Sequence, residues 1–192
     1  MKKIVLDIGG TSIKSAVFEH GALSDIRETP TQASLGGAHV MAVAKEIIQS
    51  YKETYDFSQI GISTAGQVNP VSGHIIYANQ NIPGYTGTPV RKIMEEAFQV
   101  PVYVDNDVNA AALGEAFYGA GRGEKNFVCL TYGTGVGGAA FLDGKLYRGS
   151  SFSAGEFGAL IVHPEDRVPQ KDMYSGCYEK YASATALIAR AQ

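Results

Sequence analysis

A glycine-rich segment occurs twice in this chain and constrains its fold more than any other feature. Residues 2–23 align without a gap onto residues 125–146, which places Gly10 opposite Gly133. In both copies an apolar run leads into a turn of glycine and threonine, and a second apolar run follows. Two copies of a strand–turn–strand unit predict two related lobes that each offer a glycine-rich loop to a shared cleft. A ligand with several phosphate groups would suit such a cleft.

The first copy also carries side chains suited to binding phosphate and a metal ion. Gly9 and Gly10 let backbone N–H groups approach a ligand without a Cβ penalty. Asp7 places a carboxylate at the end of the strand, Thr11 adds a hydroxyl group, and Lys14 adds a cation. These residues predict a phosphate and metal cradle. A strand, two glycines and another strand also describe an ordinary tight hairpin, so the residues alone leave both interpretations open.

Composition and charge argue against several classes of protein. The 192 residues carry a formal net charge of −3 and no run of Lys or Arg, which argues against nucleic acid as a partner. Two cysteines are too few for a disulfide framework or a cysteine zinc site. Because the sequence has neither a signal peptide nor a long apolar span, we expect a cytoplasmic protein with no membrane partner.

The order of the expected elements indicates an α/β protein with a mixed sheet and helices on its faces. In open α/β sheets, ligands bind outside the carboxyl ends of the strands. Asp7, Gly66 and the segment Asp105-Asn106-Asp107 would all lie at such ends. Apolar periodicity predicts strands over residues 59–63, 101–104 and 160–162, and helices over residues 38–51, 88–98, 108–120 and 177–190.

Two polar segments hold further candidate residues. An Asp at a helix start, such as Asp107, usually caps the helix. The three residues Asp105, Asn106 and Asp107 offer more than a cap requires, which favours a functional role. The amide-rich loop around Asn81 suits the hydroxyl groups of a sugar, and it equally suits a plain turn.

The two halves of the chain differ in completeness. Residues 1–120 contain the full alternation of strands and helices expected of a first lobe, with the first glycine-rich loop. Residues 121–192 contain the second loop and one helix pattern, and then the sequence stops. We therefore expect a second lobe that is only begun, in a chain that is a fragment of a longer protein.

With these residues laid out, the sequence resembles the sugar kinases of the ROK family (repressors, open reading frames and kinases). The resemblance implies the actin-like ATPase (ribonuclease H-like) fold, with a complete first lobe and a partial second lobe. It extends over all 192 residues, and the matching motifs occur in family order. They are Asp7-Ile8-Gly9-Gly10-Thr11, Asn81-Ile82-Pro83-Gly84-Tyr85, Asn106-Asp107-Val108-Asn109-Ala110-Ala111, Gly133-Thr134-Gly135-Val136-Gly137-Gly138, Gly155-Glu156-Phe157-Gly158 and Gly176-Cys177-Tyr178-Glu179.

The resemblance implies an ATP-dependent kinase acting on a hexose or N-acetylhexosamine, at the 6-hydroxyl group. Asp107 matches the general base that takes the proton from the attacking hydroxyl group. ATP and Mg²⁺ are the implied cofactors, and Asp7 would orient Mg²⁺ through water. The implied sugar-binding residues are Asn81, Asn106, Glu156, Glu179 and Gly66, and the implied phosphate-binding residues are Gly9, Gly10, Thr11, Lys14, Gly133, Thr134 and Gly135.

The chain departs from many family members at the positions of a structural zinc site. Ala159 stands in the place of the zinc-binding histidine, and Gln170 and Asp172 stand in the places of two of the three cysteines. Cys177 remains, with His163 nearby, and one thiol with one imidazole does not make such a site. We therefore predict no zinc. Among zinc-less relatives, N-acetylmannosamine kinases resemble the segment 76–88 more closely than β-glucoside kinases do.

Other functions remain open at this point. A DNA-binding repressor of the family would need a helix-turn-helix module before Asp7, which this sequence has no room for. A sugar-sensing protein without catalysis, a glucokinase or a β-glucoside kinase are the alternatives to an N-acetylmannosamine kinase. A chaperone or filament protein of the actin-like group would not need Asp107 with Glu156 and Glu179. The resemblance also allows a homodimer.

Overall fold

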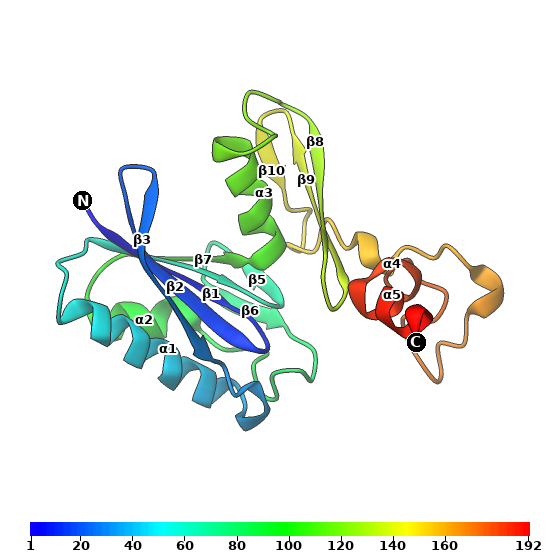
Figure 1. Cartoon of the computed structure of the whole chain (residues 1–192), viewed down its shortest axis with the longest axis horizontal. Coiled ribbons are helices and arrows are strands. Elements are labelled where there is room, and N and C mark those ends of the chain that lie inside the picture. The colour runs from blue at the N-terminus through cyan, green and yellow to red at the C-terminus, as the bar shows by residue number, and fades with distance from the viewer. The chain divides into compact units, whose positions relative to one another are not determined.

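The computed structural model describes residues 1–192, which form two compact units, Met1–Asp107 and Val108–Gln192. Figure 1 follows the chain from the N-terminal unit, in blue through cyan to green, to the C-terminal unit, in green through yellow to red. Each unit contains its own antiparallel hairpins. No helix is long and apolar enough to cross a membrane.

The first unit contains a five-stranded mixed sheet, as the sequence predicts. Its order is β3-β2-β1-β4-β7, in which β1, β4 and β7 run parallel and β1, β2 and β3 form antiparallel pairs. A parallel arrangement brings the carboxyl ends of three strands to one edge of the sheet. The strands are β1 (Lys3–Ile8), β2 (Ser12–Glu19), β3 (Ala22–Pro30), β4 (Gln59–Thr64) and β7 (Val102–Asn106).

Two helices, α1 (Gly37–Lys52) and α2 (Val90–Phe98), pack against this sheet on one side (Figure 1). The helix α2 begins at Val90 with Pro89 as its N-cap, one residue later than the expected N-cap at Thr88 and first helical residue at Pro89. A short 3-10 helix (Ala33–Leu35) precedes α1, and a separate two-stranded sheet joins β5 (Gln67–Asn69) to β6 (His74–Tyr77). The core is formed by the apolar faces of these elements, including Ile4, Ile8, Ile48, Ile60, Met94 and Val104.

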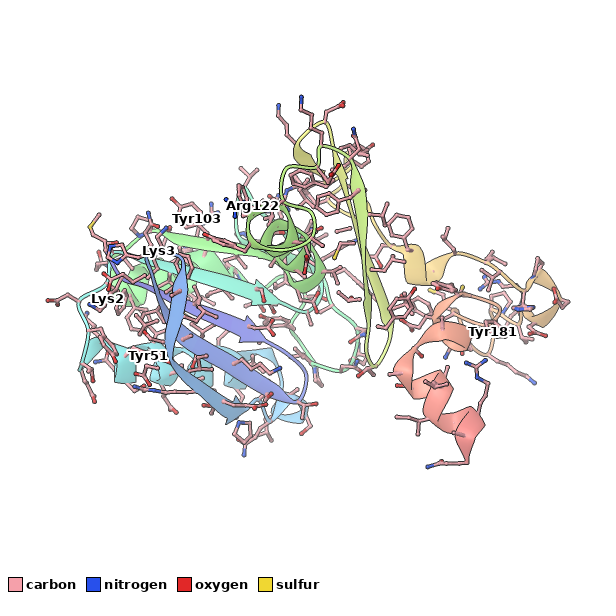
Figure 2. All side chains as sticks on the ribbon, turned by 45° about the horizontal axis from the view of Figure 1, so that its top comes forward. Lys2, Lys3, Tyr51, Tyr103, Arg122 and Tyr181 are labelled. Carbon is pink, nitrogen blue, oxygen red and sulfur yellow. The ribbon has the colours of Figure 1, made fainter.

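Tyr51 joins α1 to the sheet, and Figure 2 shows it between them. Its hydroxyl group donates to the carbonyl oxygen of Asp25 at 2.8 Å and lies 3.0 Å from Oγ of Ser15. The guanidinium group of Arg27 lies 4.1 Å from the centre of the Tyr51 ring, and its Nε and Nη2 donate to the carboxylate of Asp25. This cluster fixes the last turn of α1 against the middle of β2 and β3.

The second unit contains α3 (Asp107–Tyr118, whose first residue belongs to the first unit) and a three-stranded antiparallel sheet of order β10-β9-β8. The strands are β8 (Phe127–Tyr132), β9 (Val136–Leu142) and β10 (Lys145–Tyr147). Two short 3-10 helices follow, at Phe157–Ala159 and Pro164–Asp166, and then α4 (Glu179–Ala182) and α5 (Ala184–Ala191).

Two expected elements of the second unit are wrong. The apolar run 160–162 forms one isolated bridge, between Ile161 and Cys177, and no strand. The expected helix 177–190 is broken at Ser183, which is extended (φ −67°, ψ 157°) and whose side chain accepts a hydrogen bond from the N–H group of Ala186. A serine that caps a second helix ends the first one, because the extended backbone of the cap cannot continue it.

The repeat in the sequence corresponds to two similar pairs of hairpins. The turns after β2 and β9 both use two residues of positive φ, His20-Gly21 and Asp143-Gly144. The glycine-rich loops differ by one residue of register. Ile8 pairs with Ile13 around the first loop, whereas Tyr132 pairs with Val136 around the second, which is therefore the tighter turn.

Candidate functional site

The candidate residues of the first unit gather at the carboxyl ends of β1, β4 and β7. Strand register places Asp7 beside Ser63, and Ser63 beside Asp105. The next row contains Ile8, Thr64 and Asn106. Since residues in register on neighbouring strands point to the same face of a sheet, Asp7, Ser63 and Asp105 form one polar row.

Asp7 occupies an open position in this row. Its side chain is exposed, and its Oδ1 accepts a hydrogen bond of 2.5 Å from the hydroxyl group of Ser63. Lys14, also exposed, lies opposite Asp7 on the antiparallel strand β2. An exposed carboxylate with a fixed orientation suits a hydrated divalent cation, because Mg²⁺ prefers oxygen ligands and keeps several of its waters. The donor set therefore fits the expected metal.

The first glycine-rich loop is held on one side by hydrogen bonds and is open at Gly10. The N–H group of Thr31 donates to the carbonyl oxygen of Thr11 at 2.9 Å. The hydroxyl group of Thr31 donates to the carbonyl oxygen of Gly9 at 2.7 Å. Thr31 is fully buried. A Cβ atom added at Gly10 would meet no atom within 4 Å. The loop is thus open at Gly10, and Thr31, which no sequence motif singles out, is the residue that holds the loop.

Asn106 links Asp107 to the turn that contains Gly66. Its Nδ2 donates to the carbonyl oxygen of Gly66 at 3.0 Å and to Oδ1 of Asp107 at 2.8 Å. Asp107 is the first residue of α3, where the positive end of the helix dipole stabilises a negative charge. The structure therefore brings together three residues that the sequence placed in one pocket, with the carboxylate of Asp107 oriented by the amide of Asn106.

The loop that carries Asn81 is fixed beside the same turn. The hydroxyl groups of Tyr85 and Thr64 lie 2.9 Å apart, and both side chains are fully buried. Burial raises the pKa of Tyr85 above its ordinary value of 10.0. Gly66 has φ 96°, and a Cβ atom there would lie 2.7 Å from the carbonyl oxygen of Tyr77. Asn81 itself is exposed.

The candidate residues of the second unit include the second glycine-rich loop, and Gly133 and Thr134 in it are exposed. The backbone N–H group of Val136 donates to Oε2 of Glu179 at 3.0 Å. Glu179, expected to bind sugar, therefore lies against the loop expected to bind phosphate. Glu156 lies at the start of the 3-10 helix that packs on β9 and is exposed.

The segment aligned with the zinc loop of other family members is organised by charged side chains. Nη1 of Arg167 donates to the carbonyl oxygens of Met173 at 2.7 Å and Ser175 at 2.8 Å, and lies 3.6 Å from Sγ of Cys177. Asp172, at a cysteine position, forms an ion pair of 2.7 Å with Lys180. The absence of zinc remains a prediction.

His163 of this segment lies in contact with Tyr181, which Figure 2 labels. Nδ1 of His163 lies 2.9 Å from Oε1 of Glu165. The hydroxyl group of Tyr181 donates to the carboxylate of Asp166, which raises the pKa of Tyr181 to about 12. The imidazole of His163 is thus engaged with a carboxylate and an aromatic ring.

Comparison with known proteins now adds to this geometry. The model of the ROK family matches residues 3–192. The chain belongs to the ROK family. A glucokinase from Halalkalibacterium halodurans is 39% identical over 188 residues, which cover 95% of this chain and 56% of that protein. The chain thus spans little more than half the length of this curated relative.

Two solved structures share the fold. A protein from Listeria monocytogenes, proposed to be an N-acetylmannosamine kinase, superposes with a TM-score of 0.86 at 31% identity, over 100% of this chain and 63% of that one. A ROK glucokinase from Streptomyces griseus, in complex with glucose and AMPPNP, gives a TM-score of 0.84 at 31% identity, over 98% of this chain and 59% of that one. The expected α/β fold of the actin-like ATPases, present in part, is thereby confirmed.

Proposed function

We propose that the protein to which this chain belongs is an ATP-dependent sugar kinase. The observation that carries the proposal is the cluster of Asp107, Asn106 and Gly66 at the carboxyl ends of β7 and β4, in a chain whose family includes glucokinases. The acceptor is a hexose or an N-acetylhexosamine, and the product is its phosphate ester at the 6-hydroxyl group.

In this proposal Asp107 is the general base. As the sugar oxygen forms its bond to the γ-phosphorus, the carboxylate accepts the hydroxyl proton, and the bond to the leaving ADP breaks. Asn106 keeps the carboxylate oriented through the hydrogen bond to its Oδ1. Asn81 and the Gly66 turn bind the sugar with Asn106, and Glu156 and Glu179 bind further hydroxyl groups.

The glycine-rich loops bind the phosphate groups in the same proposal. When bound, ATP and Mg²⁺ supply the γ-phosphoryl group and the positive charge that offsets its negative charge. Asp7 orients the cation through water, Lys14 adds a positive charge, and backbone N–H groups of the two loops donate to phosphate oxygens. The phosphate-binding residues are Gly9, Gly10, Thr11, Gly133, Thr134 and Gly135. The N–H groups of Gly9 and Gly133 donate within their own loops, to the carbonyl oxygens of Ser12 and Gly135, so the other residues supply the free donors.

The sugar is the least constrained part of the proposal. Ala159 stands where zinc-bearing members have a histidine that also contacts sugar, so we propose a substrate of the zinc-less members, N-acetylmannosamine first. The likeness to the protein from Listeria monocytogenes supports this choice. A glucokinase or β-glucoside kinase is the alternative, which the 39% identity to a glucokinase favours.

The decisive experiment is a coupled ADP-release assay on the protein expressed from its own gene, with any sequence that follows Gln192 included. N-acetylmannosamine, N-acetylglucosamine, glucose, fructose and cellobiose are offered in turn, and Asp107→Asn is assayed beside the wild type. Turnover of one sugar that this substitution abolishes supports the kinase. Sugar binding by calorimetry without turnover would instead establish a sugar-sensing protein.

A further inference from the structure

A segment at the end of the chain makes three hydrogen bonds to the second glycine-rich loop, within the second unit. The N–H group of Ala184 donates to the carbonyl oxygen of Gly133 at 2.9 Å. The hydroxyl group of Thr185 donates to the carbonyl oxygen of Thr134 at 3.0 Å. Oε2 of Glu179 accepts from the N–H group of Val136 at 3.0 Å. We propose that Glu179, Ala184 and Thr185, the loop brace, position this loop for phosphate binding.

The direction of the peptide groups explains why the brace matters. In a planar trans peptide, the carbonyl group of one residue and the N–H group of the next point in opposite directions. Because the carbonyl groups of Gly133 and Thr134 point to α5, the N–H groups of Thr134 and Gly135 point away from it. Two successive N–H groups aimed to one side are what an anion requires from a loop. The brace sets that aim without touching the anion.

Gly135 has a specific reason to be glycine here. A Cβ atom at this position would overlap the carboxylate of Glu179. Only a residue without a side chain therefore lets that carboxylate reach the N–H group of Val136. The loop and Glu179 fit each other, and a larger residue at position 135 would break the third contact of the brace.

The brace is itself rigidly built. Ser183 is buried, its N–H group donates to the carbonyl oxygen of Glu179 at 3.1 Å, and its hydroxyl group caps α5 by accepting from Ala186. Nη2 of Arg190 donates to the carbonyl oxygen of Tyr181 at 2.6 Å and ties α5 back to α4. Thr185, in contrast, is exposed, and its hydroxyl group bonds to the loop.

This inference rests on the proposed function for its ligand, and it gives Glu179 a second task. One oxygen of its carboxylate is engaged with Val136, so that a sugar hydroxyl group would use the other. A bound sugar would then fix the carboxylate of Glu179, and this carboxylate fixes the second glycine-rich loop through Val136. The proposed site consequently predicts that sugar and nucleotide each tighten the binding of the other.

Thr185→Val tests the brace, because valine keeps the shape and the β-branching of threonine and removes the hydroxyl donor. A neutral hydrogen bond contributes about 0.5–1.5 kcal/mol, which corresponds to a factor of about 2 to 12. We expect lower ¹⁵N order parameters at Thr134 and Gly135, and amide exchange at Val136 and Ala184 that is faster by about this factor. Binding of AMPPNP, measured by calorimetry, should weaken by a similar factor.

Two further variants make the result decisive. Thr185→Ser retains the hydroxyl group and should restore both the order parameters and the AMPPNP affinity. Thr54→Val, the same change at an exposed site of the first unit, should alter neither. If Thr185→Val leaves the order parameters unchanged, or if Thr185→Ser is equally impaired, the brace is refuted. Failure of the wild type to bind AMPPNP would instead refute the proposed function, even if the loop of Thr185→Val becomes more mobile.

Discussion

Ser63 and Asp7 are joined across two neighbouring parallel strands, by a hydrogen bond of 2.5 Å from the Ser63 hydroxyl group to Oδ1 of Asp7. The pairing of β1 with β4 puts the two residues in register, and Lys14 of β2 lies on the other side of Asp7. A carboxylate that accepts a hydrogen bond from a neighbouring hydroxyl group loses part of its rotational freedom. Asp7 is thereby oriented before any cation binds, which lowers the entropic cost of binding one.

Ser63→Ala should therefore weaken binding of a divalent cation at Asp7. Loss of one hydrogen bond, about 0.5–1.5 kcal/mol, predicts a dissociation constant for Mn²⁺ that rises by a factor of about 2 to 12. Electron paramagnetic resonance of free Mn²⁺ measures this without relying on turnover. Ser58→Ala, just before the other end of β4, is the matched control and should leave the constant unchanged. Equal Mn²⁺ affinity in Ser63→Ala and the wild type would show that the serine does not orient Asp7.

The carboxyl ends of the parallel strands contain site residues that the sequence predicts and others, such as Ser63, that it does not. Asp7, Asn106 and Asp107 could be selected because each directly follows an apolar strand pattern, and parallel strands bring such ends together. Ser63 could not, because its contact with Asp7 depends on the register of two strands far apart in the sequence. Thr31 was missed for the same reason, since it acts on the glycine-rich loop from a distant segment.

Local patterns failed where a short apolar run had only a very short partner. Residues 160–162 bond to residues 176–178, through the N–H group of Tyr178 to the carbonyl oxygen of Leu160 and the N–H group of Val162 to that of Gly176, and this forms one bridge and no strand. The break at Ser183 carried a readable signal, a serine before an alanine-rich helix, which periodicity over the longer segment obscured. The contacts of Thr185 with the second loop required the tertiary structure.

Asp107→Asn should abolish phosphoryl transfer while the fold is retained. The amide cannot accept the hydroxyl proton, and loss of a general base lowers turnover by about 10²- to 10⁴-fold. The coupled assay measures turnover, and calorimetry should still detect sugar binding. Asp56→Asn, in the exposed loop after α1, serves as the control for an equal change of charge. Turnover within tenfold of the wild type in Asp107→Asn would assign the proton to another group.

Arg167 should stabilise the segment aligned with the zinc loop, in the absence of metal. Arg167→Ala removes the donor to Met173 and Ser175, and we expect a loss of about 1 kcal/mol in the free energy of unfolding of the second unit. Urea denaturation measures this value.

The purified wild type should contain no stoichiometric zinc by mass spectrometry, and a chelator should leave its thermal midpoint unchanged. Stoichiometric zinc, or a fall in midpoint with the chelator, would contradict the prediction.

Stability should fall in alkali because of Tyr85. Burial raises the pKa of Tyr85 above the ordinary value of 10.0, and the hydrogen bond with Thr64 only partly opposes this. The unfolded chain releases the phenolic proton above pH 10 and the folded chain holds it longer, so the folded state binds more protons there. Its stabilising contribution is therefore complete below pH 10 and is lost as the pH rises through the higher pKa of the folded state.

Tyr85→Phe removes this titration and isolates its effect. At pH 8 the variant should be less stable by about 1 kcal/mol, since the buried Thr64 hydroxyl group loses its partner. Above pH 10 its free energy of unfolding should decrease less with pH than that of the wild type. Urea denaturation at pH 8, 9.5, 10.5 and 11 measures both effects, with Tyr103→Phe on the exposed side of β7 as the control. Parallel pH profiles for Tyr85→Phe and the wild type would show that Tyr85 titrates alike in the folded and unfolded states.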